Sequence, residues 1–184
     1  MPVSLPSKYN LLALHPNDVY LDIGIWRGDS IQFAIDAGCF KKIIGIDINP
    51  ESIDFCKSRF DFNNPDGFRN WITLVEGDSA LCLWDVIKDI DTPITFFLDS
   101  HYSLLEDEVK GPNPFPLLDE LDQINQHPIK EHTIIIDDFL YMTHPQITGW
   151  TIDTIEDKLM EINMYYSFNY IANPIIGNIL IAKP

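Results

Sequence analysis

The sequence has few cysteines and no long apolar run. It contains three cysteines, Cys39, Cys56 and Cys82, and none of them is spaced as CxxC. This argues against a disulfide framework or a cysteine-ligated zinc site and favours a reducing compartment, so we expect a cytoplasmic protein. No apolar run reaches the ~18 residues of a transmembrane helix, and residues 1–10 lack the basic and apolar regions of a signal peptide.

Positive charge is also scarce. The chain has 12 Lys and Arg against 28 Asp and Glu, a formal net charge of -16 at pH 7. Because such a surface repels phosphate groups, we expect neither nucleic acid nor an anionic membrane as a partner. A neutral substrate, or a charged one bound by local groups, fits better. The 184 residues, 46% of them hydrophobic, predict a single globular domain over residues 1–184.

Strand and helix patterns alternate along the chain. Apolar runs predict strands at 19–23, 43–46, 71–75, 94–98, 132–136, 168–172 and 176–182. Amphipathic segments predict helices at 30–37, 50–60, 80–88, 117–126 and 151–163. This order predicts a Rossmann-like, three-layer α/β/α sandwich with a mostly parallel seven-stranded sheet. A hairpin turning at Asn173-Pro174 would add one antiparallel strand.

The first strand–helix–strand unit has the features of a nucleoside site. Its first strand runs into a loop with Gly24 and Gly28, and its second strand ends on Asp47. An acid at that distance from a glycine loop can accept hydrogen bonds from a ribose. The loop lacks the G-x-G-x-x-G pattern, since residues 25–27 separate the two glycines. Without that pattern there is no tight pyrophosphate turn, which weakens a dinucleotide interpretation.

Acids recur where the predicted strands end. They are Asp22, Asp47, Asp78, Asp99 and the pair Asp137-Asp138. A single such aspartate is often only a helix cap. Five such sites in succession indicate more, because the carboxyl ends of parallel strands meet at one edge of a sheet, where ligands bind.

Three of these segments resemble the class I S-adenosylmethionine-dependent methyltransferases: D-I-G-I-W-R-G at 22–28, the acid Asp47, and E-G-D-S at 76–79. The resemblance covers about residues 18–140. It implies that the glycine loop approaches the methionine part of the cofactor. It also implies that Asp47 holds the ribose, Ile48 contacts the adenine, and Asp78 faces the adenine amino group. The implied cofactor residues are Asp22, Gly24, Trp26, Gly28, Ser30, Asp47, Ile48, Asp78 and Ser79.

L-D-S-H-Y-S at 98–103 and I-I-D-D-F at 135–139 resemble the methyltransferases that use a divalent metal, including O-methyltransferases acting on sugars. The implied metal ligands are Asp99, Asp137 and Asp138, whose oxygens suit Mg²⁺ or Mn²⁺. His101 stands where many relatives carry another acid. We expect it to be the catalytic base, with Asp99 as the second choice. Alternatively, His101 is only a surface-loop histidine, and the pair Asp137-Asp138 only caps a turn.

The sequence thus predicts a methyltransferase that acts on a hydroxyl of a sugar or other small acceptor. The compact chain suggests one module of a larger glycan-modifying protein. We also expect Trp26 and Tyr102 to line the pocket. Residues 103–116 and 139–150 either cover the acceptor or are inert loops. Two rival functions stay open. A nicotinamide-dependent oxidoreductase would bind NAD, and a non-catalytic cofactor-binding module would need neither the metal nor the base.

Overall fold

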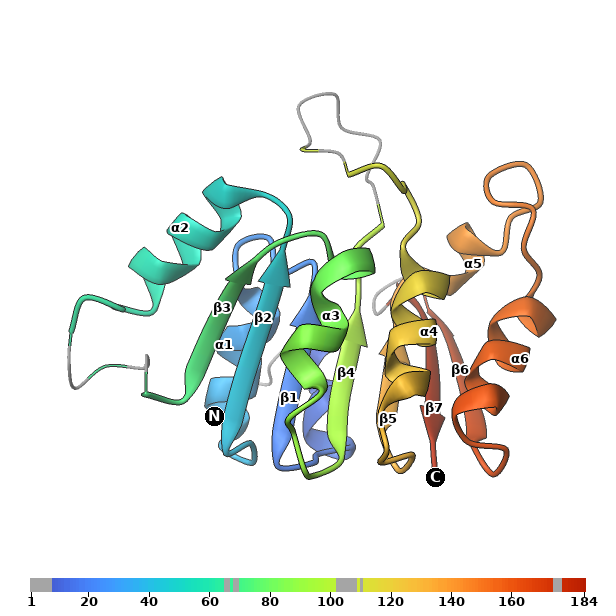
Figure 1. Ribbon diagram of the computed structural model, residues 1–184, viewed down its shortest axis with the longest axis horizontal. Helices are drawn as coiled ribbons and strands as arrows, with labels where there is room; N and C mark the ends of the chain where they lie inside the picture. Colours follow the sequence, from blue (N-terminus) through green and yellow to red (C-terminus); the bar gives the residue numbers. More distant parts are fainter. Residues whose placement is uncertain (1–7, 65–66, 68–69, 102–108, 110, 174–176) are drawn as a thin grey trace.

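The computed structural model describes residues 8–64, 67, 70–101, 109, 111–173 and 177–184 (Figure 1). Its strands are β1 Val19–Ile23, β2 Lys42–Asp47, β3 Ile72–Glu76, β4 Ile94–Leu98, β5 Thr133–Ile136, β6 Ser167–Asn173 and β7 Gly177–Lys183. Its helices are the 3-10 helix η1 Lys8–Leu14 and the α-helices α1 Asp29–Ala37, α2 Pro50–Arg59, α3 Ser79–Ile87, α4 Leu117–Gln126, α5 Phe139–Met142 and α6 Ile152–Ile162.

The strands form one sheet in the order β3-β2-β1-β4-β5-β7-β6. The pairs among β1 to β5 are parallel, and β7 runs antiparallel to both of its neighbours, β5 and β6. The predicted sheet, with one antiparallel strand contributed by a C-terminal hairpin, is confirmed. The predicted turn at Asn173-Pro174 falls partly outside the described residues.

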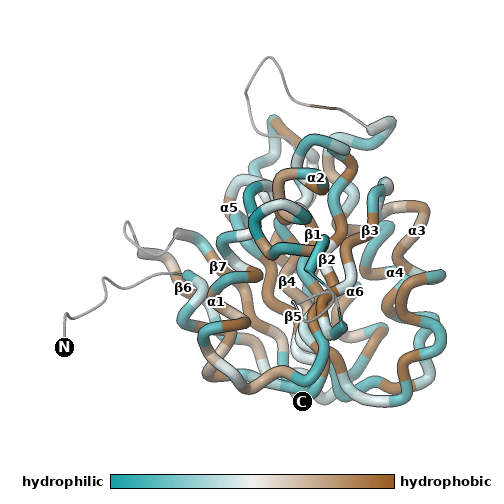
Figure 2. The backbone as a smooth tube through the Cα atoms, turned by 90° about the vertical axis from the view of Figure 1, so that its left-hand side faces the viewer, coloured by the Kyte–Doolittle hydropathy of each residue, from teal (hydrophilic) through white to brown (hydrophobic). Residues whose placement is uncertain are grey.

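Helices cover both faces of the sheet, which accounts for the continuous apolar runs of its central strands. Every residue of β1, β4 and β5 is buried, because a parallel strand between two helical layers has no solvent face. One core lies under α3, α4 and α6, and the other under η1, α1 and α2 (Figure 1). Figure 2 shows the same arrangement as hydrophobic strands surrounded by more hydrophilic segments.

Local capping chemistry fixes where several helices begin. Asn49 Oδ1 accepts a hydrogen bond from the Glu51 N–H at 2.9 Å, and Pro50 occupies the first turn of α2. Asp78 caps α3 in the same way, and Thr151 forms a reciprocal pair with Thr154 at the start of α6. These signals explain why the predicted helix starts lie within a residue of the observed ones.

Backbone hydrogen bonds extend the sheet just beyond its strand ends. The Asp99 N–H donates to the Ile23 carbonyl at 3.0 Å, and the Asp137 N–H donates to the Leu98 carbonyl at 3.0 Å. The acids that follow β4 and β5 are therefore held level with the end of β1 along the carboxyl edge. Among the described residues, no helix is both long and apolar enough to cross a membrane.

Candidate active site

A cavity of about 490 Å³ opens at the carboxyl edge of the sheet. This volume lies within the range of small-molecule sites. The cavity is lined by residues that follow β1, β2, β3, β4 and β5, together with Lys8 of η1. Predicted residues that line it are Gly24, Trp26, Asp47, Ile48, Asp78, Ser79, Asp99, His101 and Asp138.

The glycine loop reaches the cavity because Gly24 has no side chain. Its φ is +84°, and a Cβ placed there would lie 2.2 Å from the carbonyl oxygen of Asp99. Only glycine allows the ends of β1 and β4 to approach so closely. Trp26, with φ +44°, follows in a left-handed conformation and is 64% exposed at the rim of the cavity.

Asp47 ties this loop to the end of β2. Its Oδ2 accepts a hydrogen bond from the Trp26 N–H at 2.9 Å, and its Oδ1 accepts one from the Asn49 N–H at 2.8 Å. Each carboxylate oxygen can accept more than one hydrogen bond. These two hydrogen bonds fix the carboxylate at the cavity wall.

Asp78 presents an acceptor at the end of β3. Its Oδ1 caps α3 through the Ala80 N–H at 3.0 Å. Its Oδ2 is buried and has no hydrogen-bond partner within the described part of the chain. Buried acceptors are normally paired. Because Asp78 lines the cavity, a ligand N–H such as an adenine amino group would satisfy this oxygen.

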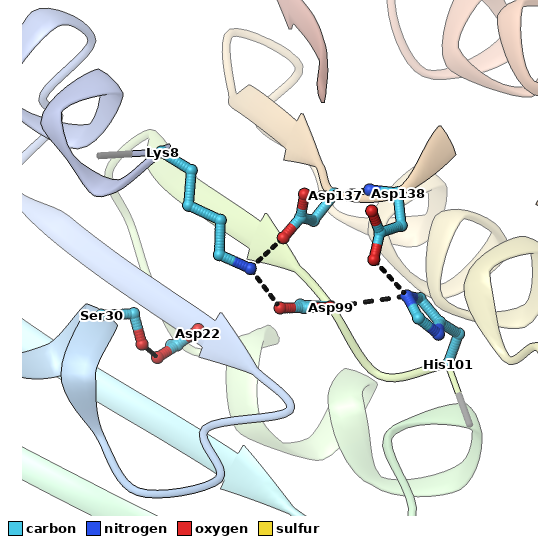
Figure 3. Close-up of polar contacts among 7 residues, drawn as sticks. All are labelled: Lys8, Asp22, Ser30, Asp99, His101, Asp137 and Asp138. Atoms are coloured by element: carbon cyan, nitrogen blue, oxygen red, sulfur yellow. Dashed lines mark hydrogen bonds and ion pairs between the residues drawn. The ribbon is translucent and has the colours of Figure 1, made fainter. Parts of the chain in front are cut away.

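Three predicted cofactor residues lie beneath the loop and do not line the cavity. Ser30 Oγ donates a hydrogen bond to Asp22, which is fully buried (Figure 3). Burial raises the pKa of Asp22 to about 7, although the Ser30 hydrogen bond opposes this. Gly28 packs against α2, where a Cβ would lie 2.9 Å from both Cys56 Sγ and the Phe60 ring. These residues shape the loop from below.

His101 lies between two of the predicted metal ligands. Its Nε2 is 3.3 Å from Asp138 Oδ2 and 3.6 Å from Asp99 Oδ1. The hydrogen bond with His101 lowers the pKa of Asp138. Burial raises the pKa of Asp99 to about 7, and the charge of Lys8 partly opposes that effect.

These three side chains fit a divalent cation. Asp99, His101 and Asp138 each offer one ligand atom, and the three atoms lie within 4.8 Å of one another. Two carboxylate oxygens and an imidazole nitrogen suit Mn²⁺ and, with more water ligands, Mg²⁺. The predicted third ligand, Asp137, is outside this group.

The side chain of Lys8 was not foreseen from the sequence. Its ammonium contacts Asp137 Oδ2 and lies 3.0 Å from Asp99 Oδ2 (Figure 3). Burial disfavours the charged amine, but the two carboxylates outweigh it and raise the pKa of Lys8 above its ordinary value. Lys8 is 91 residues from Asp99 in sequence, and no local motif marks it.

Glu120 of α4 was also missed. Its side chain is fully buried, and its Oε1 accepts hydrogen bonds from Ser79 Oγ and Ser100 Oγ, both at 2.5 Å. Both serines line the cavity. The only feature of the sequence that points to this contact is the position of Glu120 on the buried face of an amphipathic helix.

Some expected pocket residues cannot be placed. Tyr102 lies outside the described residues, as does most of the first half of 103–116. Within that segment, Val109, Gly111 and Asn113 line the cavity. The segment 139–150 begins with α5, in which Phe139 and Met142 are buried.

Solved structures with this arrangement of strands and helices include methyltransferases. A methyltransferase from Podospora anserina, solved with SAH bound, matches with a TM-score of 0.62 at 13% identity, covering 96% of this chain and 75% of that one. A protein from Staphylococcus aureus, assigned as a caffeoyl-CoA O-methyltransferase, matches with a TM-score of 0.59 at 16% identity, covering 96% and 80%. An rRNA methylase from Streptococcus thermophilus matches with a TM-score of 0.54 at 13% identity, covering 95% and 92%.

No family model matches the sequence, and no curated protein matches it significantly. At these low identities, the structural matches show a shared fold, the Rossmann-like fold of methyltransferases. Proteins named for different acceptors share this fold, so the fold does not select an acceptor.

Proposed function

We propose that the chain is an S-adenosylmethionine-dependent methyltransferase that methylates a hydroxyl of a sugar or other small acceptor. The observation that carries this proposal is the charge of the cavity. Asp47, Asp78, Asp99 and Asp138 face it, against the single ammonium of Lys8 among the described residues. Such a cavity attracts a sulfonium and repels a pyrophosphate, which favours S-adenosylmethionine over a nicotinamide dinucleotide.

The cofactor supplies a methyl group on a sulfonium sulfur. Asp47 would accept hydrogen bonds from the ribose hydroxyls, and Asp78 Oδ2 would accept one from the adenine amino group. Ile48 would pack against the adenine. The backbone at Gly24 would lie along the methionine part, because no side chain separates it from the cavity.

The acceptor hydroxyl would lie beside the acid cluster that follows β4 and β5, which consists of Asp99, Asp137 and Asp138. Methyl transfer needs an aligned oxygen and a group that removes its proton. His101 Nε2 can take that proton in the tautomer that carries its hydrogen on Nδ1, and Asp138, 3.3 Å away, would stabilise the imidazolium that forms. Alternatively, Nε2 can bind a divalent cation with Asp99 and Asp138, and the bound cation would lower the pKa of the hydroxyl. The two roles exclude each other because they use the same nitrogen.

Titration calorimetry tests the cofactor assignment directly. We expect S-adenosylmethionine and S-adenosylhomocysteine to bind and NAD to give no heat. Tighter binding of NAD would favour the oxidoreductase alternative. Labelled S-adenosylmethionine can then be used to screen sugars and other small hydroxyl compounds. Cofactor binding without transfer to any of these, or to larger glycans, would favour the non-catalytic module.

The acceptor class has its own support. The net charge of -16 disfavours RNA, although an rRNA methylase shares the fold. We therefore propose a small molecule or a glycan as the acceptor. Including a structured RNA in the transfer screen would test this choice, since preferential labelling of the RNA would overturn it.

A further inference from the structure

Lys8 is held in place by packing. The buried residues Leu11 and Leu12 anchor η1 in the core beside α1. The ring of Tyr9 lies 5.8 Å from Phe97 of β4 and 5.3 Å from Phe33 of α1. The Lys8 side chain is thereby directed across the carboxyl ends of β4 and β5.

The Lys8 ammonium divides the acid cluster into two halves (Figure 3). It contacts Asp137, whose side chain is 2% exposed, and Oδ2 of Asp99. The other carboxylate oxygen of Asp99, Oδ1, faces His101. Asp99 therefore binds the lysine with one oxygen and keeps the second for the His101 side.

We propose that Lys8 is a positioning residue that occupies the Asp137 side of the cluster, so that a divalent cation is taken by Asp99, His101 and Asp138. This proposal deepens the proposed function, since it concerns the same site. It also departs from the resemblance, which implied that Asp137 is a metal ligand.

The balance of charges agrees with this division. Three carboxylates, Asp99, Asp137 and Asp138, carry three negative charges when ionised, and the ammonium cancels one of them. Two negative charges remain, which match one divalent cation. Removing the ammonium would leave an excess of negative charge a few ångströms from the cation, and charges at that distance interact strongly in a partly buried site.

Mn²⁺ titration followed by the electron paramagnetic resonance of the free ion tests the proposal, with neither cofactor nor acceptor present. We expect wild type to bind one Mn²⁺ and Lys8→Met to bind it at least tenfold more tightly. Lys8→Arg should behave like wild type, because it keeps the charge. Lys41→Met removes an exposed lysine paired with Asp18 and should leave Mn²⁺ affinity unchanged.

Two charge-matched double variants separate a ligand from a neighbouring charge. Lys8→Met with Asp137→Asn should bind Mn²⁺ about as tightly as wild type, since one charge of each sign is lost. Lys8→Met with Asp138→Asn has the same net charge but loses a ligand, and it should bind at least tenfold more weakly. Circular dichroism of each variant establishes that it is folded.

Equal weakening in the two double variants would overturn the proposal, because Asp137 would then be a ligand. It would also fail if Lys8→Met bound Mn²⁺ as wild type does, or if none of the folded proteins bound Mn²⁺. Failure of S-adenosylmethionine binding, with the Mn²⁺ series as expected, would refute the proposed function alone.

Discussion

The hydroxyl of Ser79 donates a hydrogen bond to the buried carboxyl of Glu120 at 2.5 Å. The same oxygen, Oε1, accepts a second hydrogen bond from Ser100. One side chain of α4 therefore joins the segment after β3, at the proposed adenine side, to the segment after β4, at the proposed reaction centre. Its other oxygen has no partner among the described residues.

Glu120 makes stability depend on pH. Burial raises its pKa from an ordinary 4.5 to about 7, with the two serine hydrogen bonds opposing. The folded state thus holds a proton that the unfolded state releases, and this contribution to stability falls as pH rises from about 4.5 to 7. Glu120→Gln should be more stable than wild type by up to about 3 kcal/mol at pH 8 and similar to it near pH 4.5.

Urea unfolding at several pH values measures this difference. Asp119→Asn provides the control, because Asp119 is a neighbouring acid of the same helix without the buried position of Glu120. A stability difference between Glu120→Gln and wild type that does not change with pH would contradict the expectation.

Asp47→Ala should weaken the binding of S-adenosylhomocysteine. The carboxylate both holds the Trp26 N–H and faces the cavity. A hydrogen bond to a charged group contributes about 1.5–3 kcal/mol, so we expect the Kd to rise about 10- to 100-fold. Calorimetry measures this, with Asp54→Ala as the control, since Asp54 pairs with Lys57 on the exposed side of α2. Equal effects of the two substitutions would refute the assignment.

His101→Gln should slow methyl transfer without weakening cofactor binding. Loss of a general base lowers kcat by about 10²- to 10⁴-fold, and loss of a metal ligand would act on the same step. The rate of methyl transfer to the acceptor found by screening gives kcat. The Kd for S-adenosylhomocysteine, measured on the same variant, shows whether cofactor binding has changed. His144→Gln, in an exposed turn, is the matched control. An unchanged kcat would show that His101 takes no part in methyl transfer.

Gly24→Ala should destabilise the fold far more than Gly38→Ala. Both glycines have positive φ, but a Cβ at Gly38 meets nothing within 4 Å, whereas one at Gly24 meets Asp99 at 2.2 Å. We expect Gly38→Ala to cost about 1 kcal/mol for its backbone conformation. Gly24→Ala should cost several times that, roughly 3 kcal/mol or more, or prevent folding. Chemical unfolding compares the two, and similar losses would show that the contact with Asp99 relaxes easily.

The fold was largely predictable because its signals are local. Continuous apolar runs marked β1, β4 and β5, and caps such as Asn49 and Asp78 marked the helix starts. The elements that were missed, η1 and α5, are short segments without a full amphipathic repeat.

The site was predictable where the chain places acids at strand ends. Asp47, Asp78, Asp99 and Asp138 all line the cavity because the carboxyl ends of parallel strands share one edge. Lys8 and Glu120 were not predictable. The packing of η1 and α4 brings these two side chains to their partners. No spacing in the sequence predicts such contacts.

The position of β7 has a consequence for how the protein is made. β7 lies between β5 and β6, and Ile136 of β5 pairs with Leu180. During synthesis β5 can join β4 early, but its other edge stays open until residues 177–183 have left the ribosome. An open, largely apolar strand edge is a template for pairing with other chains. This edge of β5 is therefore open to misassembly while α6 and β6 are being made.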